Sequence, residues 1–388
     1  MLTRRQNLLN VFQHQIPQWL PVTGHVDPYN QPSQKDLPAA LAEPLKEVKW
    51  QDEATIAFSR YLGLEIMDWY KIPVKVTRKR VVVETFSQGE TTIHLWHTPA
   101  GDLREIIRCC RGPGKVTSSN RVEHLVKGPE DLKALAAIFE DEVIQPDPQG
   151  LAEVRQRRQL IGEEGLLLGP MEGTPLGMMY RVFTGVETLA YLWTDARKAL
   201  KDCFSVMEKN YLQRLRLALQ SDLDAIVTVD DTSTTAVSPA MFEVCNLDLT
   251  NRRSRLTHQA GKLYFHHSCG HIRDLLPLYR QTEMDAVHFF TIPPLGNVTV
   301  GQGRCLLGDR ITIIAGLVQL AEPMDDLELV RRSITEMLSQ AVPWDHFILS
   351  VAAYPHRTME QTKFVVDCVR EFDRKHLARK ENLPVSRH

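Results

Sequence analysis

The 388-residue chain has no apolar stretch long enough to cross a bilayer as a helix. Its charges nearly balance, with 46 Lys and Arg against 48 Asp and Glu, so it presents no strongly basic surface for nucleic acid. The charges at the N-terminus are not followed by the apolar segment of a secretory signal. These absences predict a protein that binds neither membranes nor nucleic acids.

Cysteine is sparse and irregularly placed. The seven cysteines are odd in number and show no spacing typical of a disulfide framework. Such cysteines are typical of reduced thiols, and we therefore expect a cytoplasmic location. The adjacent Cys109 and Cys110 are not suited to a local disulfide, and we expect them to be buried strand residues.

Two widespread functional motifs are also missing. No G-x-G-x-x-G follows an apolar strand, which argues against an open dinucleotide-binding sheet. No G-x-S-x-G elbow is present, which argues against a serine hydrolase. A thiolate–imidazole pair fits poorly as well, because His267 and Cys269 would share one face of one strand instead of meeting across a cleft.

From about residue 165 onward, continuous apolar runs alternate with helical segments. This alternation predicts a parallel sheet covered by helices on both faces. About eight strands result if one lies near residues 62–69, so we predict an α/β fold, a (β/α)8 TIM-type barrel, in one domain over residues 1–388. The expected strands are at residues 20–27, 62–69, 165–172, 224–231, 263–269, 286–292, 311–316 and 346–353.

Residues 72–108 have a different rhythm. Runs rich in valine and threonine are separated by turn residues at 88–90 and 99–102. This pattern is typical of hairpins. We therefore predict an N-terminal antiparallel β-meander inserted into the barrel.

Helices are expected at the N-terminus, between the strands and at the C-terminus. Ser238 is the predicted cap of a helix that begins with Pro239. Residues 301–305 are expected to form a loop, in which Cys305 has no role. The expected helices cover residues 3–16, 52–62, 152–160, 186–195, 196–221, 239–245, 272–280, 327–341 and 359–376, and one more begins near residue 129.

In a barrel, the reactive side chains lie at the C-terminal ends of the strands. Polar residues follow the expected strands repeatedly, and we predict catalytic roles for Glu172, Asp230 and Asp231. Structural alternatives remain open, since Asp231 could cap a turn and Glu172 could be a loop carboxylate. The predicted substrate-binding residues are His25, Asp27, Tyr180, His288, Tyr354 and His356; for His288 a core position is the alternative.

The segment Leu263–His271 begins with apolar residues and continues with three histidines and one cysteine. Residues two apart on a strand point the same way, so His267 and Cys269 would face one side together. Imidazole and thiolate are ligands that suit zinc. The structural alternative is that Cys269 is a small buried apolar residue.

Several segments resemble the uroporphyrinogen decarboxylase-like superfamily. They are the opening RRQNLLNVF at residues 4–12, TPAGDL at 98–103, VSPAMFE at 237–243 and LGDR at 307–310. The matches are discontinuous but occur in this order over most of the chain. The resemblance implies the same barrel fold.

Within the superfamily, the sequence HSCG at residues 267–270 resembles the corrinoid-linked methyltransferases, such as methylcobamide:coenzyme M methyltransferase. The arginine-rich R-Q-A-G-R motif of the tetrapyrrole decarboxylases is absent after the first strand. The resemblance implies that His267 and Cys269 bind zinc. It also implies methyl transfer between a small O-, N- or S-methylated substrate, or a thiol acceptor, and a corrinoid carried by a partner protein. A homodimer stays open as an assembly.

The chain departs from this branch at two places. Residues 350–355 lack the last-strand cysteine that serves as a further zinc ligand, and Phe289 and Phe290 replace a carboxylate. Glu172 is our first candidate to complete the metal shell, while Asp230, Asp231 and His356 stay open as alternatives. The other hypotheses are a metal-free lyase acting on a carboxylated substrate, for which Arg181 and Arg357 are candidate anion-binding residues, and a non-catalytic barrel subunit.

Overall fold

The computed structural model describes residues 2–24, 53–112, 115–317, 326–351 and 359–381. The chain forms two compact units. One comprises Met1–Lys71, Glu153–Met171 and Asp222–His388, and the other comprises Ile72–Ala152 and Glu172–Ser221. The single domain expected from the sequence stays a prediction.

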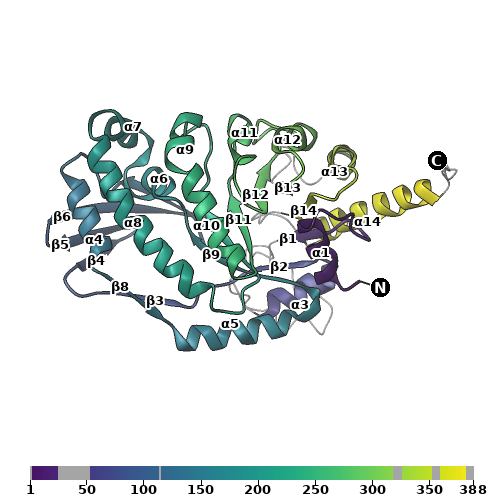
Figure 1. The fold of residues 1–388 in the computed structure, drawn as a ribbon, viewed down its shortest axis with the longest axis horizontal. Coiled ribbons are helices and arrows are strands. Elements are labelled where there is room, and N and C mark those ends of the chain that lie inside the picture. Colours follow the sequence, from purple (N-terminus) through teal and green to yellow (C-terminus); the bar gives the residue numbers. More distant parts are fainter. Residues whose placement is uncertain (1, 25–52, 113–114, 318–325, 352–358, 382–388) are drawn as a thin grey trace. The chain divides into compact units, whose positions relative to one another are not determined.

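The first unit is built on an eight-stranded sheet whose strands run parallel in the order β1-β14-β13-β12-β11-β10-β9-β2 (Figure 1). Neighbours in this order are mostly consecutive in the chain, as is usual for strands joined by short connections. The strands are β1 (Val22–Gly24), β2 (Ile66–Trp69), β9 (Gly165–Glu172), β10 (Ala225–Val229), β11 (Leu263–His267), β12 (Ala286–Thr291), β13 (Thr312–Leu317) and β14 (Phe347–Val351).

Glu65 joins the two ends of this sheet. Its backbone N–H donates to the Val22 carbonyl at 2.8 Å, and its carboxylate accepts the Val22 N–H at 2.6 Å. The indole N–H of Trp19 donates to the same carboxylate at 2.8 Å. Strands β1 and β2 are therefore neighbours, the barrel is nearly closed, and the predicted (β/α)8 fold is confirmed.

Helix α1 (Arg4–Phe12) lies at the end of the barrel where the strands begin. Leu8, Val11 and Phe12 pack into the apolar core of the barrel, and the Phe12 ring stacks on Phe265 with centroids 5.0 Å apart. Each such buried side chain contributes roughly 1.5–3 kcal/mol. Apolar side chains of α1 therefore close this end of the barrel, and the polar strand ends lie at the opposite end.

The helices of the first unit confirm most of the expected segments, but residues 301–305 are helical and the predicted loop is wrong. Thr299 and Gln302 form a capping box that starts this helix despite its two glycines. The Ser238 cap with Pro239 at the first position is confirmed. The helices are α3 (Glu53–Leu62), α5 (Pro148–Ile161, in this unit from Glu153 on), α9 (Pro239–Cys245), α10 (Leu247–Gln259), α11 (Leu276–Tyr279), α12 (Val300–Leu307), α13 (Leu327–Ala341) and α14 (Met359–Glu381).

The second unit contains the predicted antiparallel meander. Strands β4 (Val82–Gln88), β5 (Thr91–Thr98), β6 (Gly101–Gly112) and β7 (Lys115–Glu123) pair in sequence order, so the meander extends beyond residue 108. A separate antiparallel pair joins β3 (Val74–Arg78) to β8 (Glu142–Pro146). The helices of this unit are α4 (Asp131–Glu140), α6 (Pro175–Met178), α7 (Gly185–Asp195) and α8 (Arg197–Ala218).

Membrane-spanning helices and the burial of Cys109 are the next two expectations from the sequence. None of their helices is both long and apolar enough to cross a membrane. Cys109 lies on β6 and is half-buried, not fully buried.

Candidate metal site

The site lies where β10 and β11 end. The two strands pair in register, with Val229 opposite His267, so the residues that follow β10 lie beside the end of β11. The backbone N–H groups of Asp230 and Asp231 both donate to the His267 carbonyl, at 3.1 and 2.9 Å. These two bonds anchor the acidic pair to the histidine strand.

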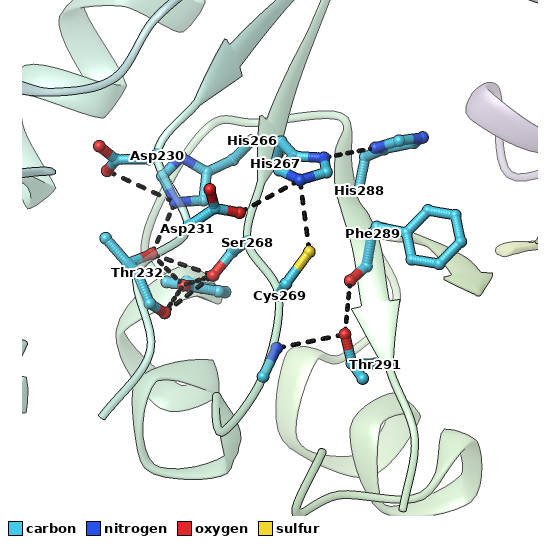
Figure 2. Close-up of polar contacts among 12 residues, drawn as sticks. Asp230, Asp231, Thr232, His266, His267, Ser268, Cys269, His288, Phe289 and Thr291 are labelled. Atoms are coloured by element: carbon cyan, nitrogen blue, oxygen red, sulfur yellow. Dashed lines mark hydrogen bonds and ion pairs between the residues drawn. The ribbon is translucent and has the colours of Figure 1, made fainter. Parts of the chain in front are cut away.

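Asp231 has a left-handed backbone conformation, with φ of 52°. Aspartate tolerates this region better than most residues, because its short polar side chain bonds locally. The turn brings its carboxylate towards His267, where Oδ1 lies 3.2 Å from Nε2 (Figure 2). A non-glycine residue held in this backbone region is often found at functional sites.

Cys269 completes a cluster of three side chains. Cys269 follows the end of β11, and its Sγ lies 3.3 Å from His267 Nε2 (Figure 2). One donor atom from each of Asp231, His267 and Cys269 can be chosen so that all three lie within 4.8 Å of one another. The side chains of Asp231 and His267 are 30% and 18% exposed, so the cluster can be reached from outside.

The electrostatics of the cluster favour a cation. Burial by itself lowers the pKa of His267, but the bonds to the Asp231 carboxylate and the Cys269 sulfur outweigh it and raise this pKa to about 9. In the metal-free protein His267 is therefore the cation that Asp231 and Cys269 surround. Carboxylate, imidazole and thiolate groups are also the ligands that suit zinc.

Polar residues at and just after the ends of β10 and β11 form a second, closed group together with Asn246 and Tyr279. Asp230 accepts a hydrogen bond from Asn246 Nδ2 at 3.2 Å, and His266 Nε2 lies 3.0 Å from the Thr232 hydroxyl. Ser268 bonds to the Tyr279 hydroxyl at 2.9 Å. These side chains are all buried, and burial lowers the pKa of His266.

A wall of rings lies beside His267. His288 on β12 places its Nδ1 2.9 Å from Nδ1 of His267, and it is only 2% exposed. The Trp69 ring, at the end of β2, packs against both histidines, with centroids 5.5 and 5.0 Å away. The sequence analysis did not predict Trp69 as a site residue. Its position at the end of a strand is the signal that could have identified it.

The other predicted site residues are not part of this cluster. The Glu172 carboxylate accepts a hydrogen bond from Arg214 at 2.9 Å, and both residues belong to the second unit. Tyr180 lies in that unit too and is half-buried. The roles assigned to these residues stay predictions. His25, Asp27, Tyr354, His356 and Arg357 lie outside the described residues.

The fold and the cluster define a (β/α)8 barrel with a group of polar side chains at the C-terminal strand ends, the place where barrel enzymes have their active sites. Residues 120–372 match the family described as "Uroporphyrinogen decarboxylase (URO-D)". The chain belongs to this family, which confirms the superfamily that the sequence segments predict. No curated protein sequence matches the chain.

Among solved structures, a methyltransferase from Methanosarcina mazei is similar over 96% of this chain and 99% of its own, with a TM-score of 0.60 and 13% identity. This likeness establishes a shared fold. A GH18 chitinase from Pseudoalteromonas aurantia matches 55% of this chain and 79% of its own, with a TM-score of 0.32 and 11% identity. The YdjI aldolase from Escherichia coli K12 matches 55% and 80%, with a TM-score of 0.23 and 8% identity. The TM-scores of the chitinase and the aldolase are too low to establish a shared fold.

Proposed function

We propose that this protein is a zinc-dependent methyltransferase that moves a methyl group between a small O-, N- or S-methylated compound, or a thiol acceptor, and a corrinoid protein. One observation carries the proposal: three side chains with zinc-type donor atoms meet at the strand ends. Membership of the family and the fold shared with a methyltransferase support it. A cytoplasmic location and docking of the corrinoid protein at the barrel mouth are parts of the same proposal.

The donor set fits zinc. Catalytic zinc sites use three protein ligands and leave a fourth position for water or substrate. His267, Cys269 and Asp231 supply nitrogen, sulfur and oxygen donors, and one such atom of each residue lies within 4.8 Å of the other two. In this assignment Asp231 takes the role of the last-strand cysteine that the chain lacks, and Glu172 remains an alternative ligand.

When bound, zinc would lower the pKa of a substrate thiol or polarise the heteroatom that carries the methyl group. The residues of the chain prepare this chemistry. His267 must lose the proton on Nε2 before it can act as a ligand, so metal binding would release protons. Asp230 is fully buried. Its geometry favours holding the acidic turn in place, while its catalytic role stays a prediction.

Metal analysis of protein purified without chelators tests the proposal. We expect about one zinc per chain, and we expect His267→Ala and Cys269→Ala to lose it. His271→Ala is the matched control, because His271 is exposed at the same strand end but is outside the cluster. Absence of zinc from the wild type, or full retention of zinc in Cys269→Ala, would contradict the proposal.

Methyl transfer can be tested with free methylcobalamin and a small thiol such as 2-mercaptoethanol. We expect protein-dependent demethylation of methylcobalamin, followed by its absorbance, and loss of this activity after zinc is removed. Re-addition of zinc restores the activity of the wild type but not of Cys269→Ala.

The family match also favours a second candidate, a metal-free lyase that decarboxylates its substrate. In that case the zinc-free protein would release carbon dioxide from uroporphyrinogen, and Arg181→Gln would weaken substrate binding. A protein with neither zinc nor turnover would support the non-catalytic subunit.

A further inference from the structure

His288 lies beside His267 on the neighbouring strand. The registers of β11 and β12 place the two residues directly opposite each other. Their Nδ1 atoms are 2.9 Å apart, which is a hydrogen-bond distance. Since His288 is 2% exposed, water cannot readily replace this bond.

One hydrogen atom must lie between the two Nδ1 atoms, because a bond needs one donor and one acceptor. The opposite edge of the His267 ring, Nε2, is turned towards Asp231 and Cys269. A ring that offers the Nε2 lone pair to a metal carries its proton on Nδ1. His267 is then the donor, and His288 accepts at Nδ1 and carries its own proton on Nε2.

Aromatic side chains hold the acceptor in place. The Trp69 ring packs against His288 at 5.0 Å and against His267 edge-on at 5.5 Å. The ring of Phe289 lies 5.3 Å from His288 at an interplanar angle of 70°. These contacts restrict both imidazole rings, so the acceptor is positioned before any metal arrives.

We propose that His288 is a positioning residue: it accepts the Nδ1 hydrogen of His267 and so keeps the Nε2 lone pair of His267 directed at Asp231 and Cys269. The inference rests on the metal site proposed above and adds the partner that fixes its imidazole ligand. Ligand histidines usually donate to a carboxylate, a carbonyl or water. A neutral imidazole in that place adds no third negative charge to a site that already contains Asp231 and Cys269.

Two substitutions at position 288 separate the acceptor from the rest of the side chain. His288→Asn places an amide oxygen near the position of Nδ1, whereas His288→Leu fills similar space without an acceptor. We expect zinc affinity, measured by competition with a chromophoric chelator, to fall about 10–100-fold in His288→Leu. His288→Asn should stay close to the wild type, and His271→Leu serves as the control.

If His288→Leu does not fold, His288→Gln replaces it, because glutamine places its amide near the position of Nε2 and cannot accept from His267 in the same geometry. Equal zinc affinity of the wild type and the variant without the acceptor would overturn the inference. Failure of the wild type to bind zinc would overturn the proposed function instead, so the two failures are distinguishable.

A second readout needs no metal. In protein labelled with ¹⁵N-histidine, a hydrogen bond between the two Nδ1 atoms gives a scalar coupling between their nitrogens. We expect this coupling in the metal-free wild type and its loss in His288→Asn. If the Nδ1 of His267 carries no hydrogen, the inference is wrong.

Discussion

His266 and His267 are consecutive residues of β11, yet their surroundings have opposite effects on them. His266 is fully buried, and burial lowers its pKa, so it is held neutral. His267 is 18% exposed on its side chain, and its bonds to Asp231 and Cys269 raise its pKa to about 9. The residue type is the same, so the partners and the access to solvent decide what each histidine can do.

The same division runs through the neighbouring residues. Asp230 and Ser268 lie with His266 on the closed face, where hydrogen bonds occupy them. Asp231 and Cys269 lie with His267 on the open face, where their donor atoms converge. The closed face therefore fixes the strand ends, and the open face offers ligands.

The largest loss of unfolding free energy should come from a substitution on the closed face. Asp230 and Arg253 are both completely buried, and the charges of both act on His266. Asp230→Ala would remove a fully buried carboxylate and leave the buried Nδ2 of Asn246 without its acceptor, which we expect to cost about 1–3 kcal/mol of unfolding free energy. Urea unfolding of metal-free protein measures this. Asp231→Ala is the control, and an equal loss in both variants would contradict the division into two faces.

On the open face, Asp231→Asn should lower the unfolding free energy of the metal-free protein by less than Asp230→Ala does. Loss of the carboxylate should lower the pKa of His267 by about one to three units, measured by NMR titration. The His267 pKa in the folded wild type, about 9, lies above the ordinary histidine value of 6.5. The stabilisation is therefore complete below pH about 6.5 and is lost as the pH rises through about 9.

Asp231→Asn should consequently destabilise the metal-free protein at pH 6 and matter little at pH 10. His266 should have the opposite effect on stability. Because burial lowers its pKa, the folded state favours its neutral form, and the unfolding free energy should fall as the pH becomes acidic. An unchanged His267 titration in Asp231→Asn would show that the carboxylate does not govern this histidine.

The smallest effect should follow from Tyr279→Phe. The Tyr279 hydroxyl lies 2.6 Å from the Thr232 hydroxyl and 2.9 Å from that of Ser268 on the closed face. Its removal should cost about 0.5–1.5 kcal/mol in thermal or urea unfolding. Zinc content should be unchanged. A loss of zinc without a loss of stability would show that the closed face acts directly on the metal site.

The sequence by itself determined the barrel and two of the three side chains of the cluster. Apolar runs with polar ends predict parallel strands, because a strand covered on both faces must be apolar throughout. The two-residue period of a strand is local, so it placed His267 and Cys269 on one face without knowledge of any other element. The order of the family segments in the chain indicated the family correctly.

Only the tertiary structure decided which other residues meet these two. Asp231 follows the end of β10, where the strand period no longer applies, and its left-handed turn is anchored by the carbonyl of His267 on another strand. Glu172, chosen from the same strand-end rule, bonds to Arg214, a partner that the strand-end rule did not predict, and its role stays a prediction. The pairing of His267 with His288 depends on the register of two strands and on the rings packed around them. These are contacts between segments distant in the sequence, and no local pattern of residues encodes them.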